Sequence, residues 1–279
     1  MYGVLIGAVL NTILDPVYIF IFHWGVKGAA IATVTSQLIS AAVLAWYFIR
    51  KGSIRLKLSK MKIVPRVAGR IVTLGMSSGV TQLVACLMQI VMNNSLVLYG
   101  NQVSTGGDVA LSAMGIIMKL AMILASICIG IGIGSQAIWG YNYGAGETKR
   151  VKKIFGLSLC LNGMIMLAGT IICFVASGPL MGLFTENPET VRLGTAALRI
   201  ISIGFIPSAV SVTASGALEG LGKGTQSLVI SLLRYIIVII PAAYVLCFFA
   251  GAGVVWNAFW ICELATAAVV CIGIKYYWN

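Results

Sequence analysis

Residues 1–22 have the sequence MYGVLIGAVLNTILDPVYIFIF, an apolar stretch with a single charged residue, Asp15. It is long enough to cross a bilayer as one helix, which requires about 20 residues. Asn11 precedes Asp15 by four residues, so both side chains lie on one helical face. A carboxylate inside a membrane is costly and is seldom present without a function. The pair therefore predicts a cation or proton site; the alternative is that Asp15 caps a kink at Pro16.

The composition extends this conclusion to the whole chain. Hydrophobic residues make up 59% of the sequence and charged residues 9%, whereas soluble domains carry roughly 25% charged residues. The sequence therefore predicts an all-α polytopic membrane protein. The net charge of +12 does not indicate nucleic acid, because the basic residues cluster between apolar runs. The cysteines and the one histidine form no metal-binding pattern, so no metal site is expected.

Apolar runs long enough to span a membrane divide the chain. Eight transmembrane helices are predicted, at roughly 2–22, 28–49, 68–98, 109–139, 151–176, 195–220, 225–249 and 254–277. Fourteen basic residues fall in alternate connectors and in the C-terminal tail, and two fall in the opposite connectors. Positively charged connectors stay in the cytoplasm. The first span is therefore expected to run outward, and the C-terminus is expected in the cytoplasm.

A weak internal repeat pairs the first two spans with the last two. When Pro16 is aligned with Pro241, and Gly25 is then aligned with Gly251, residues 25–43 overlay residues 251–269. Both prolines are expected to kink their helices, since proline removes a backbone hydrogen bond. Parallel repeats are a known transporter plan. Residues 68–279 are then a complete six-helix C-terminal lobe, 51–67 a basic cytoplasmic linker, and 1–50 the last two helices of an incomplete first lobe. Four helices are expected to be missing at a truncated N-terminus.

Several segments together resemble one transporter family, the multidrug and toxic compound extrusion (MATE) family. The similarity covers the chain from end to end and corresponds to helices five to twelve of a twelve-helix, two-lobe protein. The segments that carry it are LNTILDPVYIF (10–20), WGVKGAAIATVTSQ (24–37), LGMSSGVTQLVACLMQIVMNNSLVLYG (74–100), GIGIGSQAIWGYNYGAG (130–146) and VWNAFWICELAT (255–266).

The resemblance implies a set of site residues. In the family an Asn and an Asp on helix five, a Thr on helix six and an Asp on helix one bind H⁺ or Na⁺. The matching positions here are Asn11, Asp15 and Thr33, and the helix-one Asp lies outside this chain. The coupling ion would be H⁺ or Na⁺, and no cofactor is expected.

Polar residues in the later spans are candidates for a substrate cavity. Gln82, Gln89 and Asn93 form one stripe on a helical face, which suits either bulky organic cations or hydrogen bonds between helices. Lys119 and Glu263 are charged residues within spans, and such residues pair with one another or face a cavity. Both interpretations stay open for each set.

The leading functional hypothesis is a secondary antiporter of the plasma (inner) membrane that exports organic cations or drugs. One alternative is a lipid-linked oligosaccharide flippase of the same superfamily, which would need Lys119, Arg199 or Arg234 for anionic substrates. Another is a non-transporting scaffold, or half of a split transporter whose partner chain supplies the four missing helices. Membrane lipids and small organic cations are the other expected partners. The sequence shows no nucleophile–base pair or phosphate loop, so no enzymatic activity is predicted.

Overall fold

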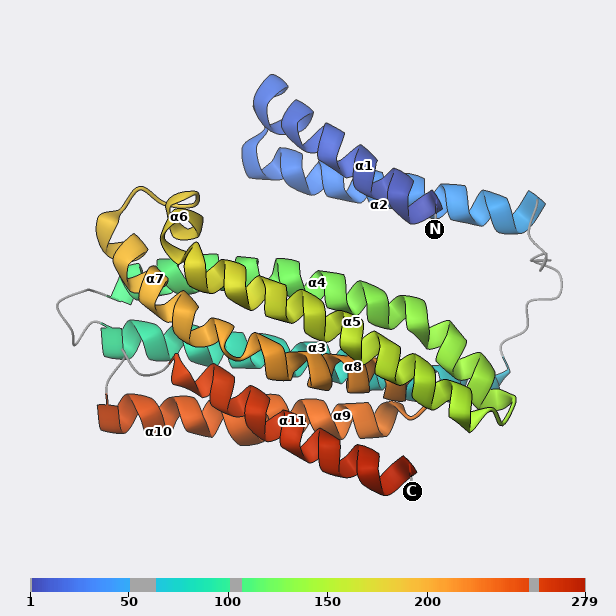
Figure 1. Ribbon diagram of the computed structural model, residues 1–279. Coiled ribbons are helices and arrows are strands. Elements are labelled where there is room, and N and C mark those ends of the chain that lie inside the picture. The colour runs from blue at the N-terminus through green and yellow to red at the C-terminus, as the bar shows by residue number, and fades with distance from the viewer. Residues whose placement is uncertain (1, 51–63, 101–106, 251–255, 279) are drawn as a thin grey trace. The chain divides into compact units, whose positions relative to one another are not determined.

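The computed structural model describes residues 2–50, 64–100, 107–250 and 256–278, and these residues are helical apart from short turns (Figure 1). No strand occurs within these ranges, so the predicted all-α class is confirmed. The chain divides into two compact units, Met1–Ala68 and Gly69–Asn279. Residues 51–63, which make up most of the predicted basic linker, lie outside the described part of the chain.

The first unit is a hairpin of two helices. Helix α1 (Tyr2–Pro16) continues into a π-helical turn, η1 (Val17–Ile21), and packs along α2 (Gly25–Arg50). The backbone takes positive φ angles of 55° at His23 and at Gly25, which reverses the chain direction. Positive φ is easy only for glycine, so the turn at Gly25 depends on that residue.

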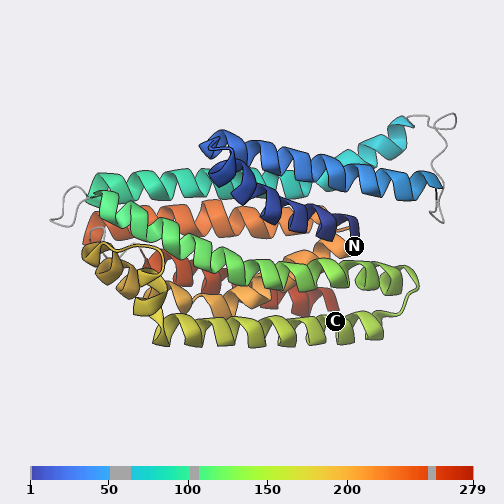
Figure 2. The same ribbon diagram turned by 90° about the horizontal axis from the view of Figure 1, so that it is seen from above.

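The second unit contains the longest helices. It is built from α3 (Pro65–Gly100, which begins just before the unit boundary), α4 (Gly107–Gly144), α5 (Thr148–Val175), α6 (Ser177–Gly182), α7 (Pro188–Ser202), α8 (Phe205–Gly220), α9 (Gly224–Leu232), the π-helical η3 (Leu233–Ile239), α10 (Ile240–Ala250) and α11 (Asn257–Trp278). Both views show α4 turning back into α5 as an antiparallel pair (Figures 1 and 2).

Helix α8 organises the core of the second unit, because it packs against α4, α5 and α11. It approaches α4 closely at Gly140 and Gly220: a Cβ on Gly140 would lie 3.0 Å from the Gly220 carbonyl oxygen. Small residues allow such contacts between membrane helices. A buried hydrogen bond between side chains crosses the core, from Asn162 Nδ2 on α5 to Thr213 Oγ1 on α8 at 2.8 Å.

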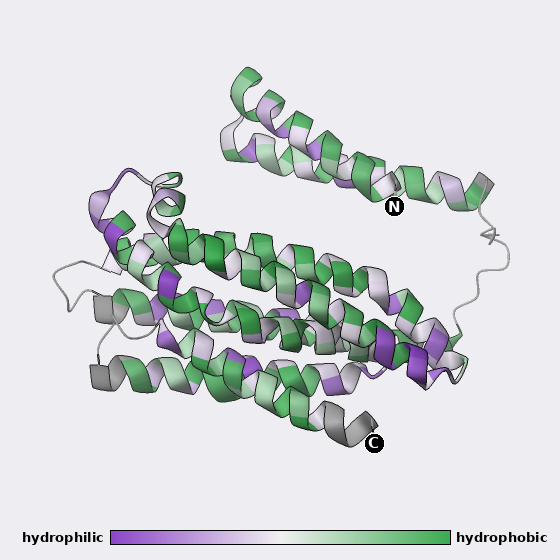
Figure 3. Cartoon of the chain, in the orientation of Figure 1, coloured by the Kyte–Doolittle hydropathy of each residue, from purple (hydrophilic) through white to green (hydrophobic). Residues whose placement is uncertain are grey.

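Apolar side chains lie on the exposed surfaces of the helices as well as in the core. Figure 3 shows hydrophobic residues along the helices and hydrophilic ones gathered at the α4–α5 and α6–α7 turns. Six helices of the described residues are long and apolar enough to cross a membrane. A shorter apolar segment, Asn257–Gly273, lies in α11. The protein is therefore a multi-pass membrane protein.

The predicted sixth span, 195–220, is not one straight helix. It consists of α7 and α8, which are bent by 54° relative to each other at a short break. Pro207 has no N–H to donate to the carbonyl of Ile203, so the α-helical ladder is interrupted there. A Cβ on Gly204 would lie 3.1 Å from the Trp260 Cα of α11, so glycine also allows α11 to approach the bend.

The two aligned prolines both lie beside π-helical turns. Pro16 ends α1 directly before η1, and Pro241 lies in α10 directly after η3. In η1 the Phe22 N–H donates to the Val17 carbonyl at 3.1 Å, five residues back, as in a π-turn. Such turns and prolines are the usual causes of bends in long helices. Widened helical turns, and not breaks, accommodate the prolines at both predicted kink positions.

Candidate cation-binding site

The structure brings together Asn11, Asp15 and Thr33 in the first unit. The Asn11 side-chain amide donates to Asp15 Oδ1 at 3.3 Å within α1. The same Nδ2 atom donates to Thr33 Oγ1 of α2 at 3.4 Å. Thr33 in turn donates to the Ala29 carbonyl at 3.0 Å. Asn11 thus connects the carboxylate on one helix to the hydroxyl on the other.

Close packing of α1 on α2 sets this register. A Cβ on Gly7 would lie only 2.9 Å from the Ser40 Cβ, and Ser40 Oγ donates to the Gly3 carbonyl at 2.8 Å. Glycine and serine let the two backbones approach, as is usual between membrane helices. With Gly7 held against Ser40, the next turns of the antiparallel pair place Asn11 opposite Thr33.

A groove of about 400 Å³ runs along this face of the first unit. Asn11 and Thr33 line it, and so do the polar side chains of Ser36, Gln37 and Ser40. Asp15 is partly buried and lies beside the groove, not in its lining. The candidate site is therefore open on the side that carries the hydroxyl and amide groups.

The chemistry of this donor set suits a hard monovalent cation or a proton. A carboxylate, an amide oxygen and a hydroxyl are oxygen ligands, which hard cations prefer. The NH₂ group of Asn11 donates to both Asp15 and Thr33. To coordinate a cation, the Asn11 side chain must therefore rotate so that its amide oxygen faces the ion. Within the described residues no group of three or more His, Cys, Asp or Glu side chains is placed to hold a metal.

The predicted cavity residues of the second unit lie on three different helices. Gln82 and Gln89 are exposed on α3, where Asn93 is partly buried, and Lys119 is exposed on α4. Glu263 of α11 instead lies in the packed interior with its side chain 13% exposed.

Glu263 forms an ion pair with a residue that the sequence did not single out as its partner. Its Oε1 contacts the Arg234 Nη2 of η3, and the Cys262 thiol donates to the Arg234 carbonyl at 3.0 Å. The other carboxylate oxygen, Oε2, is buried and accepts no hydrogen bond from the residues that the structure describes. Because 29 residues separate the partners, no local spacing rule indicates their pairing.

Comparison with known proteins identifies the family. The family model described as MatE matches residues 82–245, more than half of the chain. The chain belongs to the MatE family. The resemblance predicted from the sequence is therefore confirmed. Solved structures share the fold: a transporter of the MOP superfamily from Pyrococcus furiosus superposes with a TM-score of 0.91 at 20% identity, covering 99% of this chain and 62% of that one.

An outward-facing multidrug resistance MATE family transporter matches with a TM-score of 0.90 at 20% identity, over 99% of this chain and 61% of the other. Among curated relatives, the multidrug export protein MepA of Staphylococcus saprophyticus is 27% identical over 97% of this chain. MepA of Staphylococcus aureus shows the same identity and coverage. The chain spans about 59% of the length of both MatE relatives.

Proposed function

We propose that this protein is a secondary active antiporter that exports organic cations or drugs in exchange for H⁺ or Na⁺. The observation that carries the proposal is the contact of Asn11 with both Asp15 and Thr33 across α1 and α2. The curated relatives are named multidrug export proteins. Their names favour a transport function for this chain over an enzymatic one.

Cation entry would change the contact between the two helices. A bound Na⁺ or proton neutralises the Asp15 carboxylate and removes its attraction for the Asn11 amide. Turning the Asn11 amide toward Na⁺ also withdraws Nδ2 from Thr33. The loaded and empty states then differ in how α1 meets α2, and the widened turn after Pro16 is the natural place for α1 to bend. A ligand with different affinity for two conformations shifts their populations.

The organic substrate would be held by uncharged polar groups. Gln82, Gln89 and Asn93 follow one face of α3, where amides can accept a bulky cation without the desolvation cost of an acid. The same stripe is equally suited to hydrogen bonds with neighbouring helices. Placement in the plasma (inner) membrane, with a cytoplasmic C-terminus, belongs to the proposal and follows from the basic connectors.

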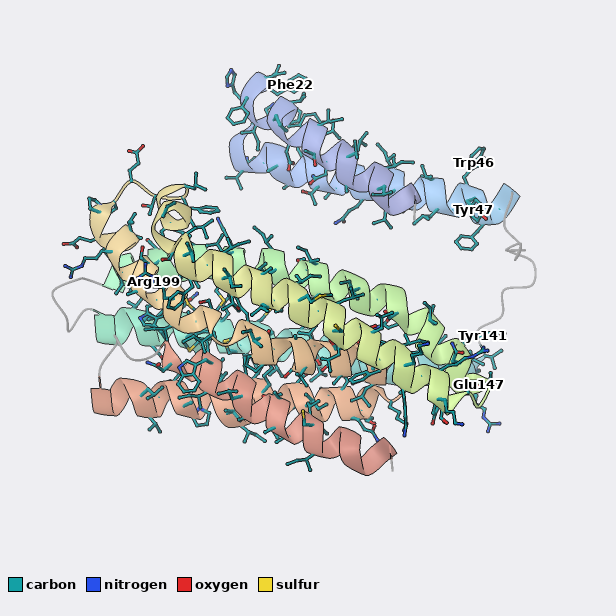
Figure 4. The ribbon with its side chains drawn as sticks, viewed as in Figure 1. Phe22, Trp46, Tyr47, Tyr141, Glu147 and Arg199 are labelled. Atoms are coloured by element: carbon teal, nitrogen blue, oxygen red, sulfur yellow. The ribbon has the colours of Figure 1, made fainter. Side chains whose placement is uncertain are left out.

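The contacts of Arg234 and Arg199, two of the three basic candidates, weaken the flippase alternative, whereas Lys119 is exposed on α4. An anionic lipid-linked sugar needs accessible cations in the cavity. Arg234 is neutralised by Glu263. Arg199 donates from Nε to Ser177 Oγ at 2.9 Å and lies 5.7 Å from the centre of the Phe174 ring; its place on α7 is labelled in Figure 4.

Binding of ²²Na⁺ to the purified chain, measured between pH 5 and pH 9, tests the cation site directly. Asp15→Asn keeps the size, removes the charge and should abolish binding. Asn11→Ala should weaken binding about tenfold, as expected for loss of one ligand to a charged group. Thr12→Val is the matched control, since the Thr12 hydroxyl donates to the Ala8 carbonyl of its own helix at 3.0 Å. If Na⁺ does not bind, proton uptake that is lost in Asp15→Asn assigns H⁺ as the coupling ion.

Transport is measured as ethidium accumulation in proteoliposomes driven by a Na⁺ or H⁺ gradient. Because the chain spans about 59% of its relatives' length, the assay includes residues 1–279 alone and with a co-expressed chain that supplies four further helices. Gradient-driven uptake that is lost in Asp15→Asn supports the antiporter. Uptake by Asp15→Asn at the unsubstituted rate refutes the coupling role of Asp15, and no uptake in either preparation favours the scaffold.

A further inference from the structure

A pocket in the second unit is lined by none of the residues predicted to contact substrate. It has a volume of about 590 Å³ and is formed where α4 and α8 end and α5 and α9 begin, with the later turns of α11 as its remaining wall. A volume of this size is typical of a small-molecule site, about 300–1,000 Å³. Tyr141 and Glu147, labelled in Figure 4, mark this end of the α4–α5 pair.

One part of the pocket is positively charged. Lys152 of α5 and Lys223, just before α9, both line it, and among the described lining residues there is no acid. The Lys223 ammonium lies 5.7 Å from the centre of the Tyr143 ring, which also lines the pocket. Thr148 and Gln226 add uncharged polar groups. This arrangement favours an anionic group.

The remaining wall is apolar and well packed. Val151, Phe155, Ala214, Ala217 and Val270 line the pocket and belong to a buried hydrophobic cluster formed by α4, α5, α8 and α11. A small inorganic anion would leave this surface in contact with water. An occupant that uses both parts must carry an anionic head and a hydrocarbon portion.

The charge pattern of the chain indicates the source of such a molecule. The pocket lies at the end of the unit that carries the basic α4–α5 turn and Lys223, and basic connectors of membrane proteins face the cytoplasm. The cytoplasmic leaflet contains anionic phospholipids, which attract basic groups near its surface. We propose that the pocket binds an anionic phospholipid of the cytoplasmic leaflet, with its phosphate between Lys152 and Lys223 and part of an acyl chain against Phe155 and Val270.

This site is independent of the proposed antiport. It lies within the second unit, whereas Asn11, Asp15 and Thr33 lie in the first. Lipid binding is therefore measured on the purified chain without any transport assay, and its failure leaves the cation site untouched.

Native mass spectrometry of the full chain in detergent, titrated with dioleoyl phosphatidylglycerol or dioleoyl phosphatidylcholine, tests the proposal. Phosphatidylglycerol should bind tightly with a stoichiometry of one lipid per chain, and phosphatidylcholine should not. Lys152→Gln with Lys223→Gln should weaken that binding about 25-fold, because each lysine near a membrane surface contributes a factor of about five. Lys149→Gln with Lys153→Gln is the matched control: it removes the same number of charges, from the start of α5, at residues that do not line the pocket.

A second variant tests the apolar wall. Gly273 lines the pocket, and a Cβ there would meet no atom within 4 Å. Gly273→Phe should therefore fill the space and weaken phosphatidylglycerol binding at least tenfold while leaving the melting temperature in phosphatidylcholine unchanged. The proposal is overturned if the two lysine pairs weaken binding equally, since this would indicate general surface attraction. It is also overturned if Gly273→Phe binds normally, or if inorganic phosphate competes with the lipid at equal affinity.

Discussion

Breaking the ion pair between Arg234 and Glu263 by removing one partner should strongly destabilise the second unit. The two side chains are only 22% and 13% exposed. Removing one partner of a buried pair leaves an uncompensated charge and costs about 3–5 kcal/mol. Arg234→Gln should be the most harmful change, because Glu263 Oε2 already lacks a partner among the described residues. Losing Arg234 would leave both oxygens of a buried carboxylate unpaired.

Glu263→Gln should be milder, since an amide oxygen can still accept from Arg234. The Arg234 guanidinium also lies 5.3 Å from the centre of the Tyr235 ring, which partly offsets its loss of a counter-ion. The double variant Arg234→Met with Glu263→Leu should recover most of the stability, because apolar replacements of a buried pair are often neutral. At about 2–4 °C per kcal/mol for a unit of this size, Arg234→Gln should lower the melting temperature by about 10 °C.

Thermal unfolding in detergent, followed with a thiol-reactive fluorophore, measures these changes. Cys262 is buried beside the pair, and Cys128 and Cys173 are buried elsewhere in the unit, whereas Cys86, Cys160 and Cys271 are exposed. The exposed thiols are blocked before heating, so the labelling that appears on heating reports loss of packing. Lys119→Gln is the matched control, because it removes a basic residue that is exposed on α4. The reasoning is refuted if Arg234→Gln has the same melting temperature as the Lys119→Gln control. It is also refuted if the double variant loses as much stability as the two single variants added together, because the two side chains would then not interact.

Three further predictions concern packing. Asn162→Leu should lower stability by about 1–3 kcal/mol, because the Thr213 hydroxyl loses the amide that donates to it in the core; the same thermal assay measures it. Gly140→Leu should destabilise strongly, since its Cβ would lie 3.0 Å from a backbone oxygen, whereas Gly130→Leu, with nothing within 4 Å, should be tolerated. Gly7→Val should separate α1 from α2 and weaken ²²Na⁺ binding without changing any oxygen ligand; unchanged binding would show that the helix contact does not set the site.

Part of the site was predictable because its signal is local. Asn11 and Asp15 are four residues apart on one helix, so helical geometry alone places them side by side. The absence of any other charge in residues 1–22 marks the carboxylate as unusual. Thr33 came only from the family resemblance, because its contact with Asn11 crosses from one helix to another and depends on the fit of Gly7 against Ser40.

By itself the sequence determined the fold class, since the length and apolar composition of its runs leave only membrane-spanning helices that satisfy their own backbone hydrogen bonds. The tertiary structure alone decided which distant side chains meet. The bend between α7 and α8, the pairing of Arg234 with Glu263, and the pocket beside Lys152 and Lys223 each involve residues brought together by helix packing. Helix periodicity describes one helix at a time, whereas these features depend on the crossing and register of several helices, which are set by the shapes of all the residues between them.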